Sequence, residues 1–476
     1  MNPQPILLIV GPTGRRERRL VEPGKTSIKK GSSHVSDATG IARWLGPSVD
    51  TTAPRNTWLA CLIALTALLV LGNLVADATL PLNYGWDVRV NCAAVDAHAA
   101  GLDPYFVKNL KGTRFSYPYL PVTLDAFRPL CAGNFLVGHY RGVYLVLAVL
   151  CALILPGLGR ARTSPRDVAL RVLCALGAFV GFEWVLASGN FAMLAGVLTA
   201  LALRFLLRPS ASGAWDRGFA LRVGGAALLG LVTSFKLVFC PVLAALYFLP
   251  LPRGRKLALI AVAALGFVLP ILISRVFYAD LFSSWLLAIA GQIPGQHAVD
   301  LVETNPSLLL LAHSLLEQAG LGDSKPLLLA VYALAALALV LVPFVLSVLR
   351  AAGSGPGRAG ESLLARLDRW LIDHPHAASR ITMLAMFALY VTSPRLKEYA
   401  FFELAVYAAV LIADLPAVAL AAMLGAGVLA PGLISMTGRT VEGSFTLLIV
   451  ALTCFWILLL DFRAEPMRRA PEDLRP

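Results

Sequence analysis

The sequence predicts an all-α, polytopic membrane protein with about twelve transmembrane helices. Of its 476 residues, 58% are hydrophobic and only 14% are charged, whereas a soluble domain carries about 25% charged residues. Apolar runs of roughly twenty residues recur, each long enough to cross a bilayer as a helix. Because lipid offers the backbone no hydrogen-bond partners, these runs are expected to be helical. The alternating pattern of a membrane β-barrel is absent from the sequence.

The expected spans follow one another along the chain with a single long interruption after the first. That interruption is a loop over 77–141, and the stretch 305–318 is apolar but short, which favours a re-entrant or interfacial helix. The expected spans are 57–76, 142–158, 169–187, 190–207, 220–235, 237–251, 257–275, 326–349, 379–392, 399–415, 416–434 and 443–461.

Charge and composition divide the chain into three regions. Residues 1–56 are rich in Pro, Gly, Ser and Arg, which predicts a disordered, basic cytoplasmic tail. Residues 57–461 form the transmembrane domain, and 462–476 form a second cytoplasmic tail. The net charge of +13 comes from Arg and Lys that cluster in short loops on one side of the spans. This pattern favours a multi-pass protein of the cell membrane with 77–141 outside, and it argues against nucleic-acid binding.

The long 77–141 loop is expected to open with a helix that runs from about Asp87 to a stop at Gly101. Its apolar residues recur at helical spacing, and Asp87, Asn91 and His98 lie on a neighbouring polar face. Such a helix would lie along the membrane surface and hold a carboxylate at the height of the lipid headgroups.

Cysteines and metal-ligand patterns exclude some kinds of site. The chain has seven cysteines and no CxxC, so a zinc or thioredoxin-type site is not expected. Cys92 and Cys131 share the 77–141 loop, where a disulfide is one alternative and two free thiols the other. The sequence shows no metal-ligand cluster, so no metal ion is expected to be required.

Short motifs spread over residues 57–461 carry a family resemblance. They are Asp87 just after the first span, Gly101-Leu102-Asp103-Pro104-Tyr105, Tyr117-Pro118-Tyr119-Leu120-Pro121, Ser188-Gly189-Asn190, residues 236–241, Asn305-Pro306-Ser307-Leu308 and Ser393-Pro394-Arg395. In this order they resemble glycosyltransferase family 87 of the GT-C superfamily, which includes polyprenyl-phosphate-mannose-dependent mannosyltransferases. The resemblance implies transfer of a hexose or pentose, with mannose favoured, from a polyprenyl-phosphate sugar. The acceptor would be a lipid or glycan hydroxyl on the extracytoplasmic side, and no cofactor would be needed beyond this donor substrate.

Such a reaction needs one carboxylate as general base. Phosphate is a stable leaving group, whereas the acceptor hydroxyl must lose its proton as it attacks, and a single displacement inverts the anomeric centre. The resemblance places the essential carboxylate at Asp87. The alternative is that Asp87 only caps the loop helix. Asp96 and Asp103 are weaker candidates, and Asp103 before Pro104 is most simply a turn residue.

The leaving phosphate is expected to meet cations at helix ends. Lys236, Arg395, Lys397 and Arg89 are the candidates for binding it, and snorkelling toward the membrane interface is the alternative for the first three.

Four further polar residues are candidates for orienting the substrates. They are Asn91, His98, Asn305 and His313. Structural roles compete for them, namely a satisfied histidine or, for Asn305, a helix cap. The main rival function for the whole chain is a multi-spanning transporter or lipid flippase, and a second rival is a non-catalytic assembly protein.

Overall fold

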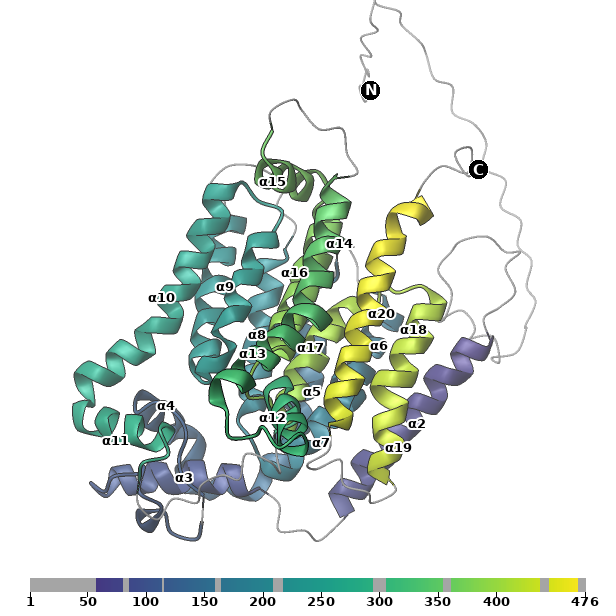
Figure 1. The fold of residues 1–476 in the computed structure, drawn as a ribbon. Helices are drawn as coiled ribbons and strands as arrows, with labels where there is room; N and C mark the ends of the chain where they lie inside the picture. The colour runs from purple at the N-terminus through teal and green to yellow at the C-terminus, as the bar shows by residue number, and fades with distance from the viewer. Residues whose placement is uncertain are drawn as a thin grey trace, which may run out of the picture. The chain divides into compact units, whose positions relative to one another are not determined.

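The computed structural model describes residues 57–79, 85–113, 115–158, 164–208, 217–293, 305–353, 361–436 and 445–469. The predicted N-terminal tail, 1–56, lies outside them. The last helix continues to Arg469, so only 470–476 of the predicted C-terminal tail lie outside as well. Every regular element in the described part of the chain is helical, which confirms the predicted all-α class (Figure 1).

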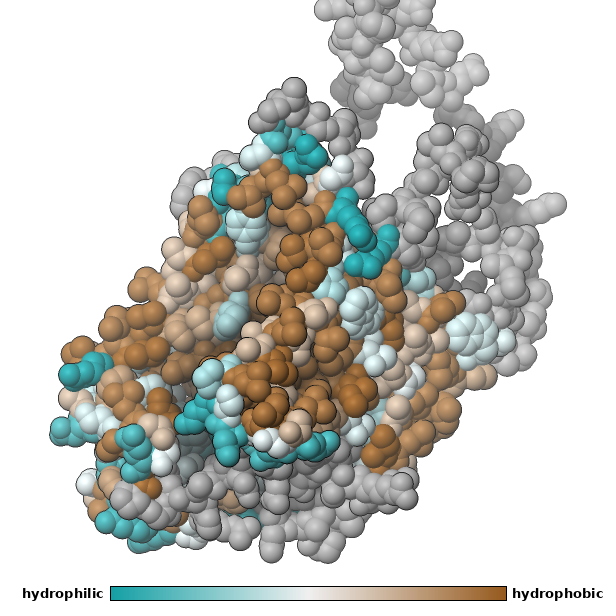
Figure 2. All heavy atoms as spheres, viewed as in Figure 1, coloured by the Kyte–Doolittle hydropathy of each residue, from teal (hydrophilic) through white to brown (hydrophobic). Residues whose placement is uncertain are grey.

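Seven apolar helices or pairs of consecutive helices are long enough to cross a bilayer, so the chain is a polytopic membrane protein. Figure 2 shows hydrophobic residues over much of the visible side of the bundle, as a surface in contact with lipid requires. The seven are α2 (Thr57–Thr79), α4 with α5 (Val122–Cys131 and Phe135–Ile154), α6 with α7 (Pro165–Gly177 and Gly181–Ser188), α10 (Arg253–Phe277), α13 with α14 (Lys325–Ala336 and Val342–Gly353), α18 with α19 (Ala417–Leu424 and Ala430–Met436) and α20 (Thr446–Arg469).

Shorter helices fill the interior of the bundle. The central pair, α16 and α17, is buried along nearly its whole length. Helix α9 packs against α8 and α10, and η5 packs against α16. These shorter elements are α8 (Ala192–Leu206), α9 (Arg217–Ser234), η5 (Leu237–Phe248), α16 (Pro375–Val391) and α17 (Phe401–Ile412).

Small helices gather at the two ends of the bundle (Figure 1). At one end lie α3 (Trp86–Ala99), α4, α11 (Ala279–Ile289) and α12 (Leu308–Gln318), and we call this the α3 end. At the other end lies α15 (Leu363–Asp373). The helix predicted between about Asp87 and Gly101 is present as α3, and it ends just before Gly101, whose φ of +73° is left-handed.

The spans expected at 142–158 and 237–251 differ from the observed helices in where they begin and in the type of helix. The span expected at 142–158 begins earlier, because α5 starts at Phe135. Its first turns contain the polar residues His139, Tyr140 and Arg141, which lower the local hydropathy, so the sequence pattern placed the start too late. The span expected at 237–251 is a 3₁₀ helix of 12 residues. Pro241 lacks the N–H that an α-helix needs there, and a rise of about 2.0 Å per residue makes this tighter helix longer than an α-helix of equal sequence.

A sharp kink separates α6 from α7 and sets the direction of the segment that carries Asn190. Phe179 and Val180 at the kink have φ values of +58° and +46°, which are strained for residues with side chains. Next to them, Gly181 lies against the start of α17, where an added Cβ would come 2.3 Å from the Phe402 nitrogen. The kink thus brings the end of α7 to the α3 end of the bundle.

Candidate functional site

Asp87 lies where the first turn of α3 meets the end of α7. The Gly85 N–H donates a hydrogen bond of 2.8 Å to the Ala187 carbonyl, which fixes the start of α3. Gly85 has a φ of +84°, and an added Cβ would lie 2.8 Å from the Tyr140 ring, so the position requires glycine. Gly85 is also the N-cap of α3, so the alternative that Asp87 caps this helix is wrong.

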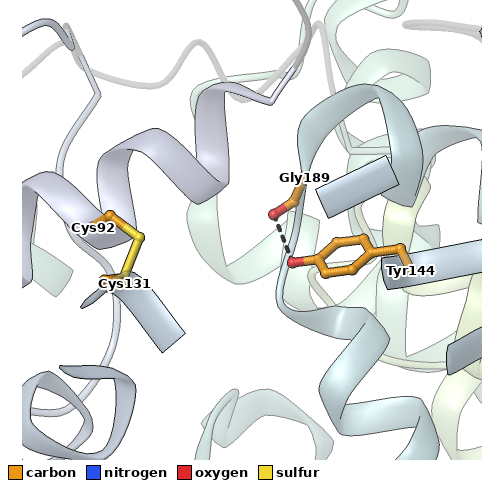
Figure 3. The surroundings of a disulfide bond; sticks show 4 residues. All are labelled: Cys92, Cys131, Tyr144 and Gly189. Atoms are coloured by element: carbon orange, nitrogen blue, oxygen red, sulfur yellow. Dashed lines mark hydrogen bonds between the residues drawn. A yellow bond between two sulfur atoms is a disulfide. The ribbon is translucent and has the colours of Figure 1, made fainter. Parts of the chain in front are cut away.

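Asn190 binds the Asp87 carboxylate directly. Its Nδ2 donates to Asp87 Oδ2 over 2.6 Å, while its Oδ1 accepts the Ala192 N–H over 2.8 Å, so both ends of the amide are held. The preceding Gly189 has a φ of +67°, and its carbonyl accepts a hydrogen bond of 3.1 Å from the Tyr144 hydroxyl (Figure 3). The carboxylate is therefore held in one orientation by a buried, preorganised partner.

Two lysines act electrostatically on Asp87. Burial raises the pKa of the Asp87 carboxyl above its usual value, although the hydrogen bond from Asn190 and the charges of Lys397 and Lys236 act in the opposite direction. Burial lowers the pKa of Lys236 to about 7, against the effect of Asp87. Coupled shifts of this kind are typical of functional sites.

The cations form one group around the start of η5. Lys236 Nζ lies 4.0 Å from the centre of the Tyr399 ring, a cation–π contact. Burial also lowers the pKa of Lys397, and the charge of nearby Arg395 adds to that effect. Arg395 itself is exposed. Lys236 and Lys397 act on the Asp87 carboxylate, and Arg395 acts on both lysines, so a group of three cations near one carboxylate favours the binding of an anionic group.

The loop that carries Arg395 and Lys397 is held by a segment far away in the sequence. Asn305 Oδ1 accepts the Leu396 N–H over 2.6 Å, and the Ser307 hydroxyl donates to the Pro394 carbonyl over 2.8 Å. Ser307 is also the N-cap of α12, so the alternative that Asn305 caps this helix is wrong. Asn305 instead holds the loop that carries Arg395 and Lys397.

A cavity of about 250 Å³ lies next to these groups, and most of its lining is apolar or aromatic. Its lining includes one basic residue, Lys236, and one acidic residue, Glu403. Glu403 is buried and accepts hydrogen bonds from the Thr199 and Tyr407 hydroxyls. The aromatic lining comes from Tyr119, Phe127, Phe191, Phe235, Phe239, Tyr390 and Tyr407.

Two of the predicted site residues on α3 lie in surroundings that differ from those of Asp87. Arg89 is exposed and lines a different pocket together with Trp86. Asn91 is only 1% exposed, and its Nδ2 has no hydrogen-bond partner among the described residues. The structure thus brings Asp87 together with Lys236 and Lys397, whereas Arg89 faces another pocket and Asn91 is buried one turn along α3 from Asp87.

The two predicted histidines also lie with other partners. His98 Nε2, near the far end of α3, is 3.9 Å from Asp125 Oδ1. His313 Nδ1, on α12, is 3.6 Å from Glu317 Oε2. These contacts are of the kind expected if each histidine has a structural role, and a role in orienting substrate stays a prediction.

A disulfide joins Cys92 on α3 to Cys131 on α4 (Figure 3), so the pairing alternative is confirmed. The two rival carboxylates lie elsewhere on the α3 end. Asp103 is a turn residue whose Oδ1 accepts the Tyr105 N–H over 2.9 Å, and Asp96 is exposed on α3.

Asn190, Tyr399 and Glu403 are among the polar residues of this region that were not predicted as site residues. Asn190 stands in a Ser-Gly-Asn motif, and Glu403 is a lone carboxylate in an apolar run, which is the signal that could have identified it. Within the described residues, no group of three or more His, Cys, Asp or Glu side chains is arranged to hold a metal ion.

No protein-family model, no curated protein and no solved structure matches this chain. The resemblance to glycosyltransferase family 87 therefore rests on the sequence motifs alone. The structure adds which residues of those motifs lie together, namely Asp87, Asn190, Lys236 and the loop 395–397.

Proposed function

We propose that the chain is a GT-C type membrane glycosyltransferase that transfers a sugar from a polyprenyl-phosphate donor to an acceptor hydroxyl on the extracytoplasmic side. The observation that carries the proposal is the geometry at Asp87. One carboxylate is oriented by Asn190 and lies within electrostatic reach of Lys236 and Lys397. A single base beside an anion-binding group is the minimum that an inverting transfer from a phosphate requires.

In this reaction the acceptor hydroxyl donates a hydrogen bond to Asp87 and attacks the anomeric carbon of the sugar. A new carbon–oxygen bond forms as the bond to the lipid phosphate breaks, and the phosphate keeps the electron pair. The hydroxyl proton passes to the Asp87 carboxylate. Lys236, Lys397 and Arg395 stabilise the charge that develops on the phosphate. The anomeric centre is inverted, and mannose is the favoured sugar.

The apolar cavity supports a lipid-linked donor rather than a soluble nucleotide sugar. Its wall combines aromatic rings with Lys236, and Tyr119 of that wall also interacts electrostatically with Asp87. A polyprenyl chain could bury its first isoprene units there while its phosphate meets Lys236. The same cavity would release the lipid phosphate directly into the membrane.

We further propose twelve transmembrane spans with both termini in the cytoplasm. Helices α8, α9, η5, α16 and α17 complete the set begun by the seven long apolar elements. The basic loops between the spans then share the cytoplasmic side, and the α3 end faces outward. Helix α3 would lie along the outer membrane surface.

The direct test is transfer by the purified protein from radiolabelled polyprenyl-phosphate mannose and polyprenyl-phosphate arabinose, with membrane extracts as acceptor and the products resolved. We expect product from the native chain and none from Asp87→Asn. Lys236 and Glu403 in one cavity are also compatible with a transport pathway. Absence of transfer from every donor, with movement of a lipid or solute across the bilayer, would favour the transporter or flippase.

A further inference from the structure

A second pocket lies on the side of α3 opposite the buried residues. Trp86 and Arg89, three positions apart, share one face of the helix, whereas Val88 and Asn91 are buried against the bundle. The pocket is open, has a volume of about 490 Å³, and is lined by Trp86, Arg89, Gly112, Thr113 and Phe115. Trp86 directly precedes Asp87, so the pocket begins one residue along the chain from the carboxylate, on a different face of α3.

The chemistry of this pocket differs from that of the apolar cavity. Phe115 is 43% exposed and Arg89 is exposed, so an aromatic ring and a guanidinium face the same space. Aromatic rings offer flat faces to the C–H side of a sugar ring, and arginine offers several N–H donors to hydroxyls. An open, partly polar pocket does not enclose a lipid chain, which needs a continuous apolar wall.

We propose that this pocket binds the saccharide part of the acceptor, so that the acceptor is a glycan that reaches Asp87 from the aqueous side rather than a membrane-embedded lipid. This rests on the proposed function, because Asp87 is the base only in that reaction. Trp86 precedes Asp87 directly, so a saccharide stacked there has its terminal sugar at the first turn of α3. Donor and acceptor then approach Asp87 from different directions.

The experiment measures saccharide binding without any donor. The purified full chain in detergent is applied to an array of linear hexose and pentose oligosaccharides, and affinity for the best ligand is then measured by microscale thermophoresis. Phe115→Ala should weaken binding about tenfold, the loss expected of one stacked aromatic ring. Arg89→Ala should weaken it about fivefold through lost hydrogen bonds. Trp86→Phe, which keeps a ring, should retain most of the affinity.

Matched controls lie in the same part of the chain. Leu102→Ala removes an apolar side chain that is 45% exposed, and Lys108→Gln removes an exposed cation, so neither should change binding. Asp87→Asn should bind saccharide normally although it transfers no sugar. The inference is overturned if the native chain binds no saccharide, or if Phe115→Ala and Arg89→Ala both bind as tightly as the native chain. Transfer to a lipid acceptor in that case would leave the proposed glycosyltransferase function standing.

Discussion

Replacing Asp87 by Asn separates catalysis from structure. Because Gly85, not Asp87, caps α3, the substitution leaves the cap unchanged and removes only a charge from the first turn. That charge favours the positive end of the helix dipole by about 0.3–1 kcal/mol, so the loss of stability should not exceed this. The amide oxygen of Asn can still accept the hydrogen bond from Asn190. The amide cannot take up the proton of the acceptor hydroxyl, so the general base is lost and turnover should fall about a hundredfold to ten-thousandfold.

The same substitution has an electrostatic effect on the donor site. The charge of Asp87 raises the pKa of Lys236, which burial otherwise lowers to about 7. Without that charge Lys236 loses its proton at a lower pH, so donor binding by Asp87→Asn should weaken near neutral pH and recover on acidification. Donor affinity and turnover should therefore both be measured across pH 5.5 to about 8, a range that spans the charge change of Lys236. Turnover should stay low even where donor binding is restored.

Asp96→Asn is the matched control, because it removes an exposed carboxylate from the same helix. Its turnover should stay within about threefold of the native value, under 1 kcal/mol of barrier. Near-normal turnover by Asp87→Asn would refute the assignment of the base and turn attention to Asp103. Loss of donor binding at every pH, together with lost turnover, would instead mean that Asp87 has a structural role.

Three further predictions concern the cations, the packing and the topology. Lys236→Met should raise the donor KM about tenfold or more, because a charge-assisted contact with the phosphate is lost. The donor KM of the native chain should rise as pH passes above about 7, where Lys236 loses its proton. A native KM that does not change across that range would exclude Lys236 from phosphate binding. Gly181→Ala should destabilise the fold by about 3 kcal/mol, because its Cβ meets backbone of α17, whereas Gly138→Ala has open space and should not; thermal aggregation in detergent measures both. Lys111→Cys, at an exposed position on the α3 end, should react with an impermeant maleimide in intact spheroplasts; reaction only after the membrane is broken would reverse the proposed orientation.

The sequence predicted the helical class and the presence of several membrane-spanning helices, because a segment that crosses a bilayer must be apolar and about twenty residues long. It also predicted the helix between Asp87 and Gly101, since a helical apolar stripe followed by glycine is a local signal. Where polar residues interrupt an apolar run, as at Arg141, the pattern placed the boundary wrongly. The 3₁₀ form of η5 was missed because hydropathy does not distinguish helix types.

The site itself was predictable only in part. Asp87 and Lys236 were identified one by one, but the contact that orients Asp87 comes from Asn190, more than a hundred residues later, and no local pattern encodes that distance. Asn305 was selected as a polar residue near a helix start, yet its partner is the backbone of Leu396. Glu403 was missed because it stands within an apolar run that was read only as a span.

The disulfide between Cys92 and Cys131 ties the finished structure of the α3 end to an oxidising environment. It fastens the helix that carries Asp87 to α4. In the orientation that we propose, these two thiols meet an oxidant only after export, because the cytoplasm keeps thiols reduced. A newly made chain would then gain this link between α3 and α4 only after its first loop has crossed the membrane. A production host without thiol-oxidising machinery on that side would yield chains of the right mass whose α3 lacks its covalent anchor.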